Sequence, residues 1–127
     1  MIDQPLPTRQ QVDSLLHFLP RLKQPDYDFI TGYVTGNHMP YPTYEAVVDE
    51  FIQVAGGSHW MDYEYEPSLA AAMLHDDAVL AQADLAQIKT MLTYVVRGER
   101  FADGHWGLLL KNGRIVALLR RLAEITE

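Results

Sequence analysis

The segment from Asp84 to Gly98 constrains the fold of this chain more than any other, because its apolar side chains recur at the period of a helix. They are spaced to form one apolar face, made of Leu85, Ile88, Leu92, Val95 and Val96. Asp84 and Gln87 stand three residues apart, as in a reciprocal N-terminal cap, and Arg97 followed by glycine is typical of a helix end. We therefore expect a helix over 84–97 to be the central packing element.

Three further helices are predicted from residues that suit N-terminal caps, which are in chain order Thr8 with Gln11, Thr43, and Ser68. Pro20 is expected to kink or end the first helix, because a proline ring removes one helical hydrogen bond. Gly56–Gly57 should stop the second helix, and Asp76–Asp77 should interrupt or restart the third. The chain is therefore expected to be mostly helical.

Three segments have the pattern of strands. Residues 29–34 lie in a stretch rich in glycine and proline and are expected to hold one short strand. In the segment 59–66, aromatic and acidic side chains alternate, which predicts a strand with one acidic face. Asn112–Gly113 after an apolar run predicts a hairpin over 105–117. The apolar residues at 115–119 fit either the return strand or a helix, and we expect a strand that passes into a terminal helix.

These elements predict an α+β fold: a helix-rich single domain over 1–127 with a small antiparallel sheet. The sheet is expected to consist of the segment 59–66 and the C-terminal hairpin 105–117. A chain of 127 residues, 48% of them hydrophobic, suits one domain with its own core. Residues 1–7 hold two prolines and no apolar period, so we expect a flexible tail there.

Several classes of protein are excluded or disfavoured by what the chain lacks. It holds no cysteine, which excludes disulfides, thiolate zinc sites and a cysteine nucleophile. Its N-terminus lacks the apolar core of a secretory signal, and its longest apolar run, Leu69 to Leu74, is far too short to span a membrane. We therefore expect a soluble, cytoplasmic protein without a membrane partner.

The formal net charge of −7 is spread unevenly along the chain. Acids outnumber bases strongly in 1–96, and the stretch from Glu45 to Asp84 holds no basic residue, whereas 97–127 is slightly basic. An acidic body argues against a nucleic-acid binder, although Arg114, Arg120 and Arg121 could form a local basic patch. The two oppositely charged parts are expected to complement each other within one fold or across a dimer.

The segment 97–106 concentrates polar and aromatic groups more than any other part of the chain. Its candidate ligand-binding residues are Arg97, Glu99, Arg100, His105 and Trp106. The arginines suit a carboxylate or phosphate, and His105 beside an acid suits acid–base chemistry. The segment holds no serine or threonine nucleophile. The alternative is structural: ion pairs and backbone hydrogen bonds would hold the loop, and its aromatic side chains would anchor it in the core.

Other candidate sites carry weaker signals. Trp60, Tyr63, Tyr65 and Trp106 could line a pocket or an interface, but we favour core packing for them. A metal site would need long-range convergence of His59, His75 and His105, because no paired-histidine motif is present. We expect neither a metal nor a cofactor.

The C-terminal part of the chain resembles a known family. The pattern runs from Leu92–Thr93 through the R-x-E-R-F-x-x-G-H stretch at 97–105 and Gly113 to the L-R-R-L sequence at 119–122, with Met39–Tyr41 upstream. It is similar to a family of small bacterial proteins known only as a domain of unknown function. The resemblance covers about residues 10–122 and implies a bacterial or phage source and a stand-alone domain, but no activity.

Two functions are weighed for this domain. The lack of a nucleophile or metal motif, together with the charge asymmetry, favours a non-enzymatic protein–protein interaction or accessory domain, as a homodimer or with another protein. The alternative is a small-molecule or anion-binding protein, or an enzyme acting on a phosphorylated substrate through the 97–106 loop. In that case Arg97, Arg100 and His105 would hold the anion and Glu99 would act as the base.

Overall fold

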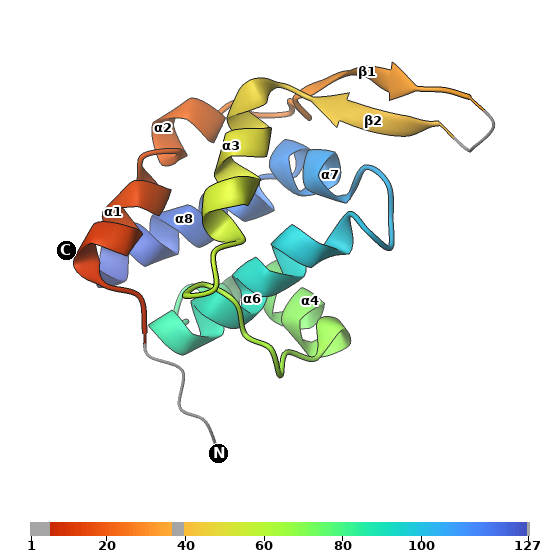
Figure 1. The fold of residues 1–127 in the computed structure, drawn as a ribbon. Helices are drawn as coiled ribbons and strands as arrows, with labels where there is room; N and C mark the ends of the chain where they lie inside the picture. Colours follow the sequence, from red (N-terminus) through yellow and green to blue (C-terminus); the bar gives the residue numbers. More distant parts are fainter. Residues whose placement is uncertain (1–5, 37–39, 127) are drawn as a thin grey trace.

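The helices of this chain surround one core, and a two-stranded hairpin extends from them (Figure 1). The computed structural model describes residues 6–36 and 40–126, and residues 1–5 of the expected tail lie outside this part. In chain order the elements are α1 (Arg9–Leu16), α2 (Leu19–Leu22), β1 (Ile30–Val34), β2 (Tyr41–Tyr44), α3 (Ala46–Ala55), α4 (Pro67–His75), α5 (Asp77–Leu80), α6 (Leu85–Gly98), α7 (His105–Lys111) and α8 (Arg114–Ile125). The fold is thus α+β and rich in helix.

Helices α6 and α8 share the centre of the molecule. Helix α6 packs against α3, α4, α7 and α8, and α8 also contacts α1, α2 and α5. In Figure 1, α4 and α6 lie below α8 and α2 lies above it. The predicted apolar face of α6 is buried at Ile88, Leu92 and Val95. No helix in residues 6–36 and 40–126 is both long and apolar enough to cross a membrane.

Local capping explains where the helices begin. Both predicted capping boxes are confirmed: Thr8 with Gln11 opens α1, and Asp84 with Gln87 opens α6, each with its two reciprocal hydrogen bonds. Asp76 caps the short helix α5, as the restart at Asp76–Asp77 predicted. The other two predicted caps are wrong by two residues, because the N-caps of α3 and α4 are glutamates at 45 and 66.

The sheet lies in the first half of the chain, between α2 and α3. Strand β1 confirms the short strand expected within 29–34, and β2 pairs with it antiparallel, with Ile30 opposite Tyr44 and Val34 opposite Tyr41. No strand was predicted at Tyr41–Tyr44, because Pro42 suggested a loop and Thr43 was expected to cap a helix. Pro42 is compatible with β2 because both strands of a two-stranded hairpin are edges. Figure 1 shows the hairpin reaching beyond the helices, while its base at Phe29 and Tyr44 is buried.

The predicted C-terminal hairpin over 105–117 is wrong, because these residues form α7 and the start of α8. A two-residue hairpin turn of the kind that Asn-Gly favours needs positive φ at both residues. Here φ is −87° at Asn112 and 79° at Gly113, and the Gly113 N–H donates to the Leu110 carbonyl. The glycine therefore ends one helix and opens the next.

The predicted strand over 59–66 is also wrong, because this segment forms turns between α3 and α4. Its burial does not alternate, since Trp60 and Met61 are both in the core. The Asp62 carboxylate accepts the N–H of Glu64 and the hydroxyl of Thr90. Such side-chain-to-backbone hydrogen bonds compete with a sheet ladder, which explains the failed prediction.

Candidate functional site

The segment 97–106 joins the two helices α6 and α7 and forms a tight loop. Arg97 lies in the last turn of α6, and Glu99 is its C-cap. The chain then turns through Gly104, whose φ of 89° lies in the left-handed region that favours glycine. Helix α7 begins immediately after this glycine, so the two ends of the loop are brought close together.

The Glu99 carboxylate holds this loop in place. Its Oε2 accepts the N–H of Gly104 at 2.8 Å, and its Oε1 accepts the N–H of Trp106 at 2.9 Å. The Tyr44 hydroxyl donates to the same carboxylate at 3.1 and 3.2 Å, and it accepts the N–H of Gly107 at 3.2 Å. The partners of Glu99 are thus N–H and O–H groups near the start of α7, where a negative charge is favourable. No ion pair within the described segments involves Glu99.

Tyr44 is fixed as a hydrogen-bond donor by its surroundings. Burial is the main cause that raises the pKa of its hydroxyl well above the usual value, and the nearby Glu99 charge raises it further. The Gly107 N–H acts in the opposite direction but is outweighed. The tyrosine therefore stays protonated. Tyr44 was not among the site residues predicted from the sequence.

His105 lies behind the loop and does not line the pocket described below. It is buried, its ring packs edge-on against Tyr94 with centroids 4.8 Å apart, and its Nε2 has no hydrogen-bond partner. Burial lowers the pKa of the imidazole, which favours the neutral form. A Cβ on Gly98 would lie only 2.2 Å from Nε2, so the ring fits because residue 98 is glycine.

The other four predicted residues, Arg97, Glu99, Arg100 and Trp106, line one surface pocket of about 500 Å³. We call it the Trp106 pocket. Its remaining wall is mostly apolar or aromatic and comes from α3, α6 and the turns after α3: Ile52, Gly56, Met61, Tyr63 and Val96. A volume of this size is typical of small-molecule sites.

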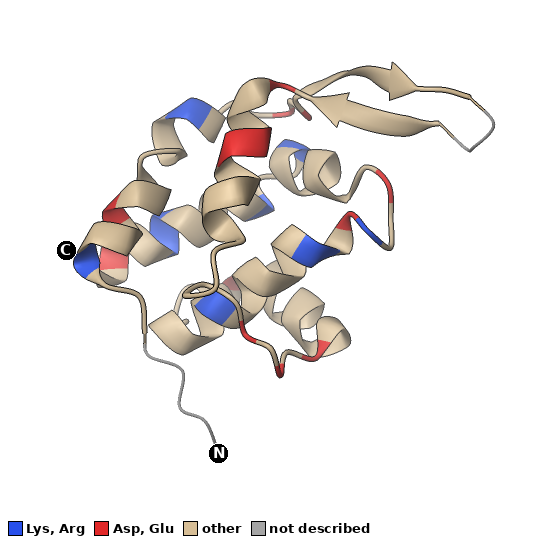
Figure 2. Cartoon of the chain, in the orientation of Figure 1, with Lys and Arg blue, Asp and Glu red and all other residues tan. Residues whose placement is uncertain are grey.

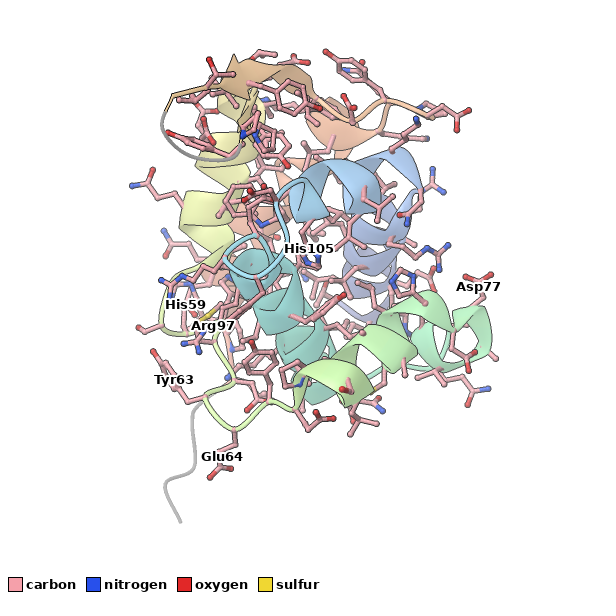
Figure 3. All side chains as sticks on the ribbon, turned by 90° about the vertical axis from the view of Figure 1, so that its right-hand side faces the viewer. His59, Tyr63, Glu64, Asp77, Arg97 and His105 are labelled. Atoms are coloured by element: carbon pink, nitrogen blue, oxygen red, sulfur yellow. The ribbon has the colours of Figure 1, made fainter. Side chains whose placement is uncertain are left out.

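Two arginines supply the positive charge of the Trp106 pocket, and Glu99 supplies one negative charge. The Arg97 guanidinium lies 5.8 Å from the ring centroid of Tyr63 and 5.7 Å from that of Tyr65, within the range of cation–π contacts. Figure 3 shows Arg97 and Tyr63 on the same side of the molecule. Arg100 is exposed. Neither arginine belongs to an ion pair within residues 6–36 and 40–126, where the arginines paired with acids are Arg9, Arg21, Arg114 and Arg121.

A second hollow of about 330 Å³ lies next to the Trp106 pocket and shares Glu99 and Trp106 with it. Asp49 and Asp103 line it, and Tyr41 to Tyr44 of β2 form one of its walls. The indole between the two hollows is fixed, because its Nε1–H donates to the Val95 carbonyl at 2.9 Å. Trp106 therefore separates a cationic hollow from an acidic one.

The other candidate residues are dispersed. Trp60 is fully buried in the core, as the preference for core packing predicted, whereas Tyr63 lines the pocket. No group of three side chains able to hold a metal ion occurs in the part of the chain that the structure describes. Of the arginines considered for nucleic acid, Arg114 pairs with Asp77 and Arg121 with Glu124. Only Arg120 is left without an acidic partner among these residues.

Comparison with known proteins places the chain in a family. No curated protein and no solved structure matches it. One family model covers nearly all of it, from Pro7 to the last residue, including the whole loop and the Trp106 pocket. The chain belongs to DUF6508, a family of unknown function, whose model matches residues 7–127.

Proposed function

We propose that this domain binds a small organic anion in the Trp106 pocket. The ligand would carry a carboxylate or phosphate for Arg97 and Arg100, next to an aromatic or apolar part that packs on Trp106. One observation carries the proposal: on a chain with 17 acidic residues, the two arginines of this pocket have no acidic partner among the described residues. Guanidinium groups pair readily with carboxylates and phosphates, which makes them suited to an external anion.

The pocket is better suited to binding than to catalysis. Glu99, the base considered from the sequence, has both oxygens engaged by hydrogen bonds from Gly104, Trp106 and Tyr44. His105 lies outside the lining of the pocket, and Tyr44 holds its proton tightly. A general base needs free access to the proton that it removes. These contacts therefore support a recognition role for the loop.

Two side chains of the pocket are held in place before a ligand binds. The contacts of Arg97 with two tyrosine rings and the hydrogen bond from the Trp106 indole restrict both side chains before a ligand arrives. Groups that are already ordered lose less conformational entropy on binding. The side chain of Arg100, which is exposed, would become ordered when the ligand binds. We therefore expect Arg97 and Trp106 to position the anion and Arg100 to close over it.

A calorimetric titration tests the proposal with phenyl phosphate and phenylacetate, which combine one ring with either anion. We expect saturable binding by the parent protein at micromolar to millimolar ligand, and binding at least about tenfold weaker in the double variant Arg97→Ala/Arg100→Ala. Arg9→Ala removes an exposed arginine that does not line the pocket and is the matched control. Equal affinity in parent and double variant, or no binding of either compound, would contradict the proposal.

Self-association through the hairpin is a second candidate function, and we propose a second copy of the chain as the partner. The sequence between Asp28 and Glu45 holds no Asp, Glu, Lys or Arg, and the hairpin in Figure 2 bears no charge. Tyr33 and Tyr41 are 62% and 47% exposed there.

Sedimentation analysis separates this candidate from a monomer. The parent protein is expected to shift from 14.5 kDa toward twice this mass as concentration rises, and Tyr33→Glu/Tyr41→Glu to remain at the lower mass. A parent protein that stays monomeric at the highest concentration would exclude the homodimer.

A further inference from the structure

The remaining exposed cations of the described residues gather at a second pocket, which lies at the C-terminal end of α7, opposite the end that the loop enters. Ion pairs within the described residues account for four arginines, the Trp106 pocket holds two more, and Lys89 is buried. The other three basic residues, Lys23, Lys111 and Arg120, all line one hollow of about 300 Å³. We call it the Arg120 pocket. Its lining shares no residue with that of the Trp106 pocket.

The fold brings these three side chains together from distant parts of the sequence. Lys23 is the C-cap of α2, Lys111 is the last residue of α7, and Arg120 lies in the second turn of α8. Helices α2 and α7 both pack against α8, and the left-handed Gly113 turns the chain sharply between α7 and α8. The convergence of the cations is therefore a result of tertiary packing and not of a basic sequence run.

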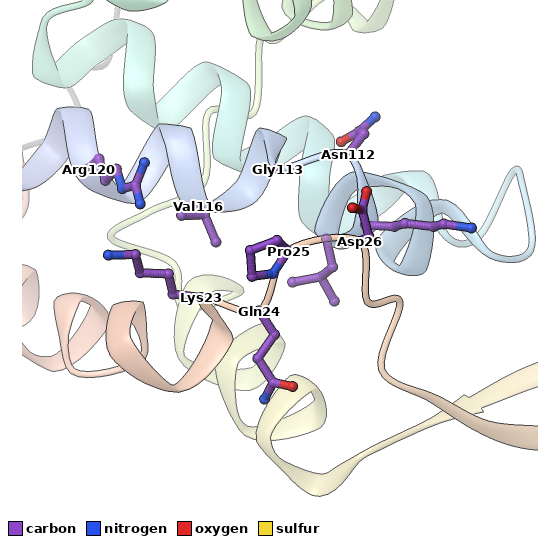
Figure 4. Close-up of a pocket in the computed structure, with 10 residues that line it drawn as sticks. Lys23, Gln24, Pro25, Asp26, Asn112, Gly113, Val116 and Arg120 are labelled. Carbon is purple, nitrogen blue, oxygen red and sulfur yellow. The ribbon is translucent and has the colours of Figure 1, made fainter.

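The arrangement within the Arg120 pocket has two ends. Figure 4 shows Lys23 and Arg120 on one side of Pro25 and Val116, and Asp26 and Asn112 on the other. Val116 is buried, so its side chain forms an apolar base between the two ends. A ligand that fits this pocket would thus combine an anionic group with a short apolar part and a hydrogen-bond donor.

The charge of the pocket also calls for a counterion. Three cations and one acid, Asp26, line it, although the chain as a whole has a net charge of −7. None of the three cations forms an ion pair with an acid in the part of the chain that the structure describes. Like charges gathered around one hollow repel one another and raise the local concentration of anions. An anion between Lys23 and Arg120 would relieve this repulsion.

We propose that the Arg120 pocket is a second anion site, which takes a small molecule with a phosphate or carboxylate group. Lys23 and Arg120 bind the oxyanion, Val116 and Pro25 contact the adjoining carbon atoms, and Asp26 accepts a hydrogen bond from the other end of the ligand. This site is independent of the Trp106 pocket, since the two pockets share no lining residue.

An amide-resolved NMR titration of the full chain tests this site. With inorganic phosphate, and separately with acetate, we expect saturable shifts at Gln24, Gly113 and Val116, and an affinity at least about tenfold lower in Lys23→Ala/Arg120→Ala. Phosphate and acetate arms distinguish the two anion types, and a shift with either supports an oxyanion site. Sodium chloride of equal ionic strength is the control for general screening.

The variant Arg97→Ala/Arg100→Ala separates this proposal from the proposed function, because it should keep the shifts at Gly113. The spectrum of each variant also reports whether it is folded, and both replaced side chains of the Arg120 pocket are exposed. The second site is overturned by three results: no shifts with either anion, equal shifts with chloride, or unchanged affinity in Lys23→Ala/Arg120→Ala. A DNA duplex that binds this face more tightly than the small anions would overturn it as well.

Discussion

At the scale of single residues, Glu99 decides what the conspicuous loop can do. A sequence with two arginines, two acids and a histidine in ten positions suggested either an ion-pair hub or an acid–base site. The carboxylate instead accepts two backbone N–H groups and the Tyr44 hydroxyl. Because this one acid is occupied by neutral donors, the arginines on either side of it remain free for another anion. Glu99 thus holds the loop through hydrogen bonds, and Arg97 and Arg100 remain able to bind an external anion.

Glu99→Ala should destabilise the fold. The change leaves two N–H groups and one hydroxyl without their acceptor, and hydrogen bonds to a charged group contribute about 1.5–3 kcal/mol each before solvent replaces part of them. We expect a loss of about 3 kcal/mol in the free energy of unfolding, measured by urea denaturation. Glu99→Gln keeps one acceptor oxygen and should lose less. An alanine variant as stable as the parent would show that Glu99 does not hold the loop.

Gly98→Ala should be destabilising although alanine favours helices, because the added Cβ would lie 2.2 Å from the His105 ring. Overpacking of this kind costs about 1–3 kcal/mol. The double variant Gly98→Ala/His105→Ala removes the ring and should relieve the clash. Denaturation of the four proteins of this cycle measures the coupling. Additive losses would mean that residue 98 and the ring do not compete for space.

His105 should make stability fall as pH drops. Burial lowers the pKa of this imidazole in the folded state, so the unfolded state takes up its proton first as the pH decreases. The stabilisation of the neutral ring is present above the unfolded pKa and is lost as the pH falls toward the folded pKa. His105→Leu should therefore lose less stability than the parent between about pH 7.5 and about pH 5.5, by thermal denaturation. A parent and variant with the same pH dependence would contradict this assignment.

At the scale of elements, helix starts could be predicted from the sequence wherever a cap is local. Thr8 with Gln11 and Asp84 with Gln87 satisfy backbone N–H groups within one turn, so a window of four residues determines the outcome. The failed predictions depended on distant partners. The segment 59–66 is held in turns partly by hydrogen bonds with Thr90 and Thr93 of α6. The Tyr44 hydroxyl donates to Glu99, which lies 55 positions further along the chain. Alternation and turn dipeptides do not contain this information.

The glycine between α7 and α8 gives a test at this scale. Gly113 has a φ of 79° and no atom within 4 Å of an added Cβ, so any cost of substitution comes from the backbone alone. Gly113→Ala should lose about 1–2 kcal/mol, and Gly113→Asn less, because asparagine adopts the left-handed region more readily. Thermal denaturation of the two variants gives the comparison. Equal losses of stability in the two variants would show that the left-handed conformation of residue 113 does not set the cost.

At the scale of the whole molecule, the distribution of charge is the feature that connects fold to function. Most exposed cations of this acidic chain either pair with acids or line one of two pockets. Four of the five site residues predicted from the sequence line the same pocket, because the α6–α7 loop is short and closed by Glu99. The second pocket could not be predicted, since its cations come from α2, α7 and α8.

The indole N–H resonances of the two tryptophans, followed while phenyl phosphate is added, test the anion-binding role most directly. Trp106 lines the pocket and its Nε1–H donates to the Val95 carbonyl, whereas Trp60 is fully buried in the core and serves as an internal control. Binding in the Trp106 pocket predicts a saturable shift of the Trp106 signal alone, which is lost in Arg97→Ala/Arg100→Ala. A Trp106 signal that does not move at millimolar phenyl phosphate, or one that moves equally in this variant, would contradict it.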